Sequence, residues 1–214
     1  AAFTGVFGHK PTFGRVPAWP SSAFGTLAHI GPIVRTVGDA ALMLNVLTQP
    51  DHRDWFAIPP DGCDFTTGLD DGIAGLRIAY SPDLGHADVD PEIAALVRSA
   101  VDVFASLGAE VEEMDPGIGD TAEIFKRHWY AGAAAAVAEF SEDQQALMEP
   151  GLREVATEGA QYSAVEYLDA SAARTVIGAK MRDFHETYDL LLTPSVSIPA
   201  FGVGLESPDP DAQT

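Results

Sequence analysis

Apolar residues recur at helical spacing in two well-delimited stretches of the chain. The first follows Thr36, a residue type that caps helix N-termini, and predicts a helix from Val37 to Leu47. The second opens at Asp90, which precedes a proline and an acid, and Gly108 closes it. The positions that we expect to form the buried face of the second helix are Ile93, Leu96, Val97, Ala100, Val103, Phe104 and Leu107.

Two short apolar runs flank the second helix and predict strands. Residues 76–80 precede the helix and residues 109–114 follow it. A strand–helix–strand order at this spacing is typical of a βαβ unit, with parallel strands and a right-handed crossover. A further buried strand is predicted at residues 188–193, where Pro194 stops it. The predicted fold class is therefore α/β.

The rest of the chain divides into helical stretches and long loops. Ser163 and Glu166 form a capping box that opens a long helix. The helical stretches are predicted at residues 120–140, in one or two pieces within 141–157 broken near Pro150, and from 163 to about 187. Residues 10–32 and 49–71 are predicted loops. A loop as long as the first often lines a functional site, and a plain surface connection is the alternative.

The charge balance excludes several classes of partner. The 214 residues carry 12 Lys and Arg against 32 Asp and Glu, for a formal net charge of -20. Nucleic acid and anionic lipid both require clustered cations, and no apolar run reaches the length of about 20 residues that spans a membrane. Neither nucleic acid nor a membrane is therefore an expected partner. The acid excess fits adaptation to high salt or an ordinary acidic protein, and we leave both open.

Individual reactive residue types do not define a site. None of the six histidines stands in a metal-binding pattern, His128 and His185 are placed on helices, and Cys63 is the single cysteine, so neither a metal site nor an internal disulfide is expected. Ser21 and Ser22 follow a proline in a turn and are interpreted as turn residues. Lys10 is interpreted as a loop anchor.

Whole segments of the chain resemble the amidase signature family. Residues 1–16 read AAFTGVFGHKPTFGRV, which is similar to the family's Ala-Ala-Phe-x-Gly-x-x-Gly-x-Lys-Pro-Thr-x-Gly-Arg stretch. Residues 31–41 read GPIVRTVGDAA, which is similar to its Gly-Pro-x-x-Arg-Thr-Val-x-Asp-Ala-Ala element. Asp51 with Asp54, residues 75–79 and residues 188–194 resemble further elements in the same order. The resemblance covers nearly the whole chain.

The resemblance implies a fold, an activity and a set of partners. The fold would be part of a mixed β-sheet covered by helices on both faces. The activity would be hydrolysis of a carboxamide C–N bond through a serine acyl-enzyme, without metal or organic cofactor, on a small-molecule amide. A cytoplasmic location is expected, with the compartment left open because any targeting segment would lie upstream of Ala1. Both a homodimer and an amidotransferase-type complex stay open as assemblies.

The same resemblance indicates which parts of the family pattern this chain lacks. The family's nucleophilic serine lies in a Gly-Gly-Ser stretch that would end just before Ala1, and its bridging serine and lysine lie further upstream. We therefore expect residues 1–214 to be a single partial domain, without catalytic residues of its own and inactive alone. A truncated relative, or an assembly component that completes a site with another chain, is the alternative.

Three residues are the candidates for substrate binding. Arg174 stands in a Tyr-x-x-Ala-x-x-x-Arg-x-x-Ile stretch similar to the one that pairs with the substrate carboxylate in glutamine-using relatives. The planar guanidinium suits a carboxylate because it binds both oxygens. Trp129 and Tyr130 fall on the helix that faces the acyl pocket in relatives. A structural ion pair for Arg174 and core packing for the two aromatic residues are the alternative interpretations.

Overall fold

The structure, a computed structural model, describes residues 1–205 and residue 208. Contacts group the chain into two compact units. The first unit comprises Ala1–Phe7, Asp70–Gly119 and Asp183–Thr214, and the second comprises Gly8–Leu69 and Asp120–Arg182.

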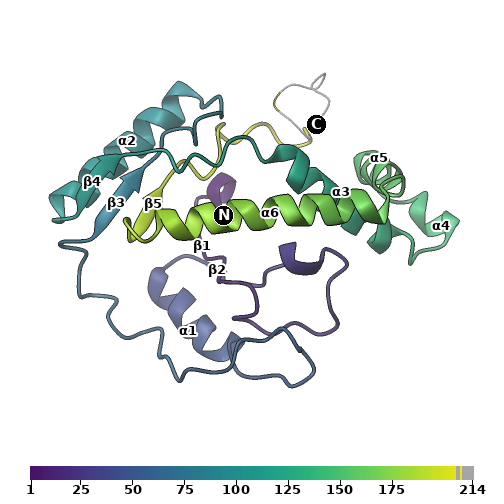
Figure 1. Ribbon diagram of the computed structural model, residues 1–214, viewed down its shortest axis with the longest axis horizontal. Coiled ribbons are helices and arrows are strands. Elements are labelled where there is room, and N and C mark those ends of the chain that lie inside the picture. The colour runs from purple at the N-terminus through teal and green to yellow at the C-terminus, as the bar shows by residue number, and fades with distance from the viewer. Residues whose placement is uncertain (206–207, 209–214) are drawn as a thin grey trace. The chain divides into compact units, whose positions relative to one another are not determined.

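A parallel sheet organises the first unit (Figure 1). Its strands are β3 (Arg77–Tyr80), β4 (Glu110–Glu113) and β5 (Leu190–Leu192), in the order β4-β3-β5. Both neighbours run parallel to β3, and the helix α2 (Pro91–Ser106) connects β3 to β4. The predicted βαβ unit and the α/β class are confirmed.

The central strand of this sheet carries the core of the first unit. Ile78 and Ala79 are fully buried, as is usual for a strand of a parallel sheet that is covered on both faces. Asp189 joins β5 to the start of β3, because its backbone N–H donates to the carbonyl of Arg77 and its carboxylate accepts from the Arg77 N–H, each at 2.8 Å.

The predicted ends of α2 are confirmed, but its predicted buried face is partly wrong. Asp90 caps the helix by accepting from the Glu92 N–H at 2.8 Å, and Gly108 follows it with a φ of 92°. The helix packs on β4 and buries Val101, whereas four of the predicted buried positions are exposed, namely Leu96 (61%), Ala100, Val103 (54%) and Leu107 (59%). Helical spacing allows two adjacent apolar stripes, and the sheet covers only one of them.

The strand β5 is shorter and less buried than predicted. It covers three residues of the predicted six-residue run, and Leu190 at its start is 40% exposed. The exposure follows from its place, because β5 is an outer strand of the three and has only β3 as a described neighbour.

The second unit is built from loops and helices. The helices are α1 (Val37–Leu47), α3 (Ala122–Val137), α4 (Glu142–Gln145), α5 (Pro150–Gly159) and α6 (Ala164–Phe184). Short 3-10 turns lie at η1 (Ala2–Thr4) in the first unit and η2 (Gly25–Leu27) here, and the two-residue strands β1 (Phe7–Gly8) and β2 (Ile33–Val34) pair with each other. Residues 49–71 form the predicted loop.

Local signals set most helix ends in this unit. Thr36 accepts from the Asp39 N–H at 3.1 Å, and α1 has the predicted bounds. The predicted capping box of α6 is confirmed, with Ser163 donating its N–H to the Glu166 carboxylate at 2.8 Å and accepting from the Glu166 N–H at 3.2 Å. The ends of α3 and α6 come three residues earlier than predicted, so His185 lies in a turn and not on a helix.

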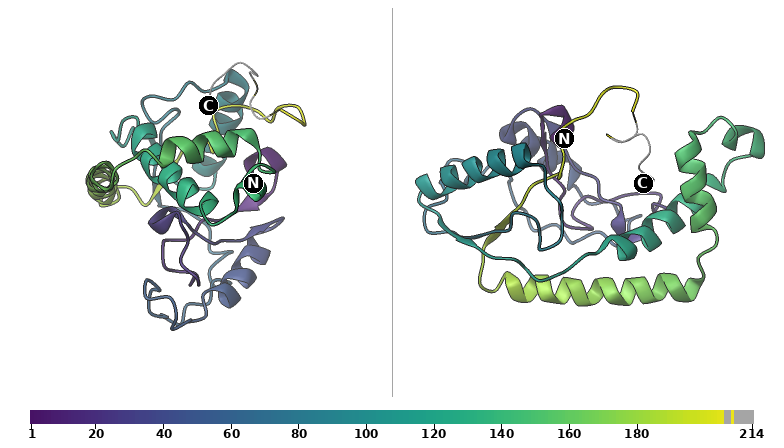
Figure 2. Two further views of the ribbon diagram at one scale, coloured as in Figure 1. Left: turned by 90° about the vertical axis from the view of Figure 1, so that its right-hand side faces the viewer. Right: turned by 90° about the horizontal axis from the view of Figure 1, so that it is seen from above.

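The helices α3 and α5 pack closely against each other (Figure 2). Gly159 makes this approach possible, because a Cβ at that position would overlap the backbone of Tyr130. An ion pair reinforces the packing, because Lys126 of α3 pairs with Glu158 of α5 at 2.8 Å. The Tyr162 hydroxyl also donates to the Glu158 carboxylate at 2.6 Å. Residues far apart in the sequence thereby hold one helical scaffold together.

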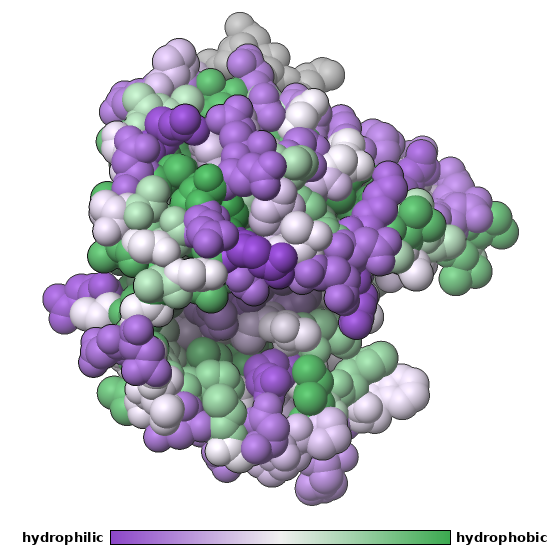
Figure 3. Space-filling model, turned by 60° about the vertical axis from the view of Figure 1, so that its left-hand side comes forward, coloured by the Kyte–Doolittle hydropathy of each residue, from purple (hydrophilic) through white to green (hydrophobic). Residues whose placement is uncertain are grey.

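The surface reflects the acid-rich composition. Hydrophilic residues cover much of the face in Figure 3, with hydrophobic side chains scattered among them. Among the residues that the structure describes, no helix has both the length and the apolar character needed to cross a membrane.

Candidate functional site

The predicted loop at residues 10–32 folds around a pocket. Apart from η2 the segment has no helix, and it closes on itself with help from residues 54–56. We call this cavity the loop pocket; its walls are residues 11–14, 16, 18, 21, 22, 25, 26, 28–30, 54 and 56. All of these residues belong to the second unit, so one compact body forms the whole cavity.

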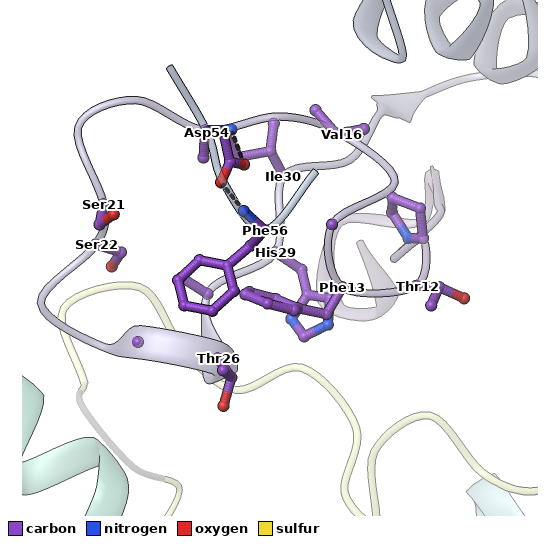
Figure 4. A pocket seen from close by; sticks show the side chains of 15 residues that line it. Thr12, Phe13, Val16, Ser21, Ser22, Thr26, His29, Ile30, Asp54 and Phe56 are labelled. Atoms are coloured by element: carbon purple, nitrogen blue, oxygen red, sulfur yellow. Dashed lines mark hydrogen bonds between the residues drawn. The ribbon is translucent and has the colours of Figure 1, made fainter. Parts of the chain in front are cut away.

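Three rings gather in the loop pocket (Figure 4). The ring of Phe13 lies edge-on to that of Phe56, with centroids 5.5 Å apart, and edge-on to the imidazole of His29 at 5.6 Å. Gly14 allows the close approach of this segment to residues 56–58, since its φ is 81° and a Cβ would overlap the Phe56 carbonyl. The cavity therefore has an aromatic wall that two distant parts of the loop region build.

The main hydrogen-bonding groups of this wall are engaged within the protein. One Asp54 oxygen accepts from the Ala18 N–H and the other from the Phe56 N–H, each at 2.9 Å. The Ser22 hydroxyl accepts from the Phe24 N–H at 3.2 Å. The loop pocket thus presents mainly apolar surface, although serine, aspartate and histidine are among its lining residues.

Arg174 on α6 reaches the same loop from a second side. Its guanidinium donates to the Thr26 hydroxyl at 2.7 Å and to the Thr26 carbonyl at 3.2 Å. Within the described part of the chain Arg174 forms no salt bridge, whereas Arg15, Arg53, Arg98 and Arg127 each pair with a carboxylate. The hydrogen bonds of Arg174 to described residues therefore go to neutral oxygens.

A small polar cavity surrounds this arginine. We call it the arginine pocket; it is lined by Thr26, His128, Ser171, Arg174 and Thr175. His128 is 3% exposed, with Nδ1 2.7 Å from the Ile124 carbonyl and Nε2 3.1 Å from the Ser171 hydroxyl. Because a carbonyl oxygen can only accept, Nδ1 carries a proton. None of the five lining residues is acidic, which suits an anionic ligand.

Trp129 and Tyr130 occupy different surroundings from Arg174. Trp129 contacts Phe24 of the loop in a tilted arrangement, with centroids 4.6 Å apart, and stacks on Phe125 at 5.4 Å. The ring of Tyr130 lies 5.1 Å from the Lys126 ammonium. Neither residue lines the loop pocket or the arginine pocket. Of the three predicted binding residues, Arg174 lines a pocket and Trp129 supports the loop that forms one.

Sequence reasoning missed the residues that surround Arg174. Thr26 and His128 carry no local pattern that marks them. Tyr167, Ser171 and Arg174 do share one face of α6, because their spacing of four and three residues matches the helical repeat. That spacing is the signal that could have placed Ser171 beside the predicted arginine.

The residues interpreted as structural show no catalytic arrangement. Ser22 is bound to the backbone of its own turn, as expected. No hydrogen bond joins Ser21 or Ser22 to a basic side chain in the described ranges, and no group of three potential metal ligands is found in them.

The comparisons with known proteins agree with this geometry. A family model described as Amidase matches residues 1–214. The chain belongs to the amidase signature family. The fold agrees as well: the crystal structure of a bacterial aryl acylamidase of that family superposes with a TM-score of 0.82 at 30% identity, over 94% of this chain and 44% of that one.

Two curated relatives indicate the range of the family. An acylamidase of Rhodococcus erythropolis is 32% identical over 94% of this chain and 43% of its own length. A glutamyl-tRNA(Gln) amidotransferase subunit from Ligilactobacillus salivarius is 32% identical over 98% of this chain and 48% of its own length. The chain thus spans less than half the length of these relatives.

Proposed function

We propose that this chain is the portion of an amidase that forms part of the substrate pocket, while residues upstream in the parent protein carry out the chemistry. The observation that carries the proposal is the family match over residues 1–214, combined with a span below half of the relatives' length. The two pockets support it, because their described residues form walls that a ligand can contact. The Ser171 hydroxyl, which lies beside His128, donates to the Tyr167 carbonyl at 2.9 Å within its own helix.

The proposed reaction is hydrolysis of a carboxamide through a serine acyl-enzyme. The resemblance assigns the nucleophilic serine, the bridging serine and the lysine to the upstream segment. The serine attacks the amide carbon, the amine leaves with a proton, and water then releases the acid. The present chain contributes binding, which orients the amide for that attack.

Arg174 is proposed to hold a carboxylate of the substrate. A guanidinium has five N–H donors, and Thr26 receives two of the contacts, so donors remain for an anion in the arginine pocket. Thr26 also fixes the plane of the guanidinium, which lowers the entropy cost of binding. Trp129 and Tyr130 are proposed as substrate-binding residues on the acyl side, Trp129 through its contact with Phe24.

A second candidate is a non-catalytic or assembly role. It is favoured by the relatives that are subunits of an amidotransferase, whose name implies work within a complex. In that case the chain would complete its site with another polypeptide.

The natural reading frame provides the deciding experiment. The 214-residue chain and the full encoded polypeptide are purified and assayed for ammonia release from a panel of carboxamides. We expect turnover from the full polypeptide only, and its loss when the serine of an upstream Gly-Gly-Ser stretch is changed to alanine. Hydrolysis by the short chain, absent from a mock purification, would contradict the proposal. A start codon at Ala1 without such a stretch would favour the assembly role.

A further inference from the structure

We propose that the loop pocket binds a neutral aromatic ring, and that the amide substrate carries this ring. That the ring belongs to a substrate rests on the proposed function. The class of ligand is inferred from the pocket alone. No part of it involves Arg174, whose proposed role is to hold an anion in the other cavity.

The loop pocket has no permanently cationic side chain in its described wall. Among the described residues, Asp54 is the one carboxylate that lines the cavity, and no lysine or arginine lines it. Both Asp54 oxygens already accept backbone N–H groups. An anionic ligand would have to leave water and lie near the Asp54 carboxylate without gaining a lysine or arginine partner, which is costly. The pocket therefore disfavours an anion, and its mainly apolar wall favours a neutral group.

The geometry of the rings in the wall also favours an aromatic ligand. Phe13 meets Phe56 at 63° and His29 at 72°, so neighbouring rings in this wall already pack edge to face. An aromatic guest can continue the same pattern, which contributes about 0.5–1.5 kcal/mol per ring pair beyond the burial of its area. A saturated ring of similar size gains the burial but not this term.

Hydrogen bonds anchor the wall of the loop pocket. Asp54 binds the backbone on both sides of the cavity, the Ile58 N–H donates to the Gly14 carbonyl at 2.8 Å, and the His29 imidazole bonds to the Leu27 carbonyl at 2.8 Å. These bonds hold the three rings in place before any ligand arrives. Such preorganisation favours binding, because little side-chain entropy is left to lose.

Three probes without a scissile bond test the ligand class separately from turnover. They are benzyl alcohol, cyclohexylmethanol and benzoate, which represent a neutral aromatic ring, a neutral saturated ring and a charged aromatic ring. Dissociation constants are measured by saturation-transfer NMR titration on the full encoded polypeptide. We expect benzyl alcohol to bind about 2- to 10-fold more tightly than cyclohexylmethanol, and benzoate to bind at least roughly tenfold more weakly.

Variants assign the binding to this cavity. Phe13→Leu and Phe56→Leu keep apolar volume but remove a ring, so each should bring the affinities of the two neutral alcohols together. Ala28→Leu fills the cavity and should abolish binding of both alcohols. Phe140→Leu, at an exposed position outside the pocket, is the matched control and should change nothing. Thermal unfolding of each variant verifies that the protein is folded.

Several results would overturn the proposal: equal affinity for the two alcohols, benzoate binding as tightly as benzyl alcohol, or binding that survives Ala28→Leu. Failure of the full polypeptide to bind benzyl alcohol would also overturn it, since the cavity would then be a packing surface for the rest of the chain. A polypeptide that binds benzyl alcohol but hydrolyses no amide would support the ring site and contradict the proposed amidase function, so the two failures are distinguishable.

Discussion

The loop pocket and the arginine pocket share Thr26, yet they use their polar groups in opposite ways. In the loop pocket, Asp54 and Ser22 direct their hydrogen-bonding capacity to the backbone of their own unit, and the surface left for a ligand is aromatic. In the arginine pocket the guanidinium of Arg174 donates to neutral oxygens, and none of the described lining residues is acidic. Residue type alone therefore does not define a pocket's chemistry; the hydrogen bonds already formed decide it.

Removal of the arginine should break this contrast most strongly. With Arg174→Ala we expect kcat/KM for amides that carry a carboxylate to fall about 10- to 100-fold, because a hydrogen bond to a charged group contributes about 1.5–3 kcal/mol. Neutral amides should be nearly unaffected. Steady-state kinetics of the full polypeptide on matched acid and neutral substrates measures the difference. Arg153→Ala, on α5 outside both pockets, is the control; an equal loss for both substrate classes would refute the assigned role.

The support behind both pockets should be the next most sensitive feature. A Cβ at Gly132 on α3 would lie 2.6 Å from Phe24 Cδ1, and Phe24 precedes η2. We expect Gly132→Ala to lower the free energy of unfolding by about 1–3 kcal/mol through overpacking. Gly178→Ala on α6 meets no neighbour within 4 Å and should stabilise the protein through helix propensity. Urea denaturation measures the free energy of unfolding of both variants. A change of the same sign in both would contradict the role assigned to packing at Gly132.

Thr26 offers a way to perturb one pocket and spare the other. Thr26→Val keeps the shape of the side chain but removes the hydroxyl that accepts from Arg174 at 2.7 Å. Binding of an anionic ligand should weaken about 2- to 10-fold, as expected for one neutral acceptor, while ring binding in the loop pocket stays unchanged. Calorimetric titration with both ligand types tests this, and Thr26→Ser should restore the anion site. Equal weakening at both sites would contradict the distinction.

Lowering the pH should reduce the stability of the α3–α5 packing gradually, and by less than the substitutions above. Lys126, and then the Tyr162 hydroxyl, hold the pKa of Glu158 below its ordinary value of 4.5. A lowered folded-state pKa stabilises the fold above the unfolded value, and this contribution is lost as the pH falls through the folded value. Stability should therefore decline below about pH 4.5. Glu158→Gln should flatten that decline in pH-dependent melting, and Glu154→Gln, which forms no salt bridge in the described chain, should not.

Much of the first unit could be predicted because its signals are local. Asp90 and Gly108 delimit α2 through their own backbone and side-chain geometry. The apolar runs on either side of α2 form neighbouring parallel strands, as predicted. A short crossover connection allows few other ways to place two consecutive strands. The predicted buried face of α2 was partly wrong, because periodicity shows that a helix is amphipathic but does not show how the helix is rotated against the sheet.

The two pockets could not be predicted, because both depend on long-range packing. Arg174 and Thr26 are 148 positions apart, and no periodic pattern links a helix to a distant loop. The ring cluster likewise joins Phe13 to Phe56 across a segment that the sequence marks only as a helix and loops. The resemblance located Arg174, but only the structure supplied its partners.

The shared position of Thr26 has a thermodynamic consequence. A residue in the wall of two cavities links their occupancies, so a guest that shifts η2 in one cavity alters the affinity of the other. Linkage requires the coupling factor to be the same in both directions. An aromatic group that tightens anion binding tenfold would itself be held tenfold more tightly once the anion is bound, so a substrate carrying both groups would gain from cooperativity within a single molecule.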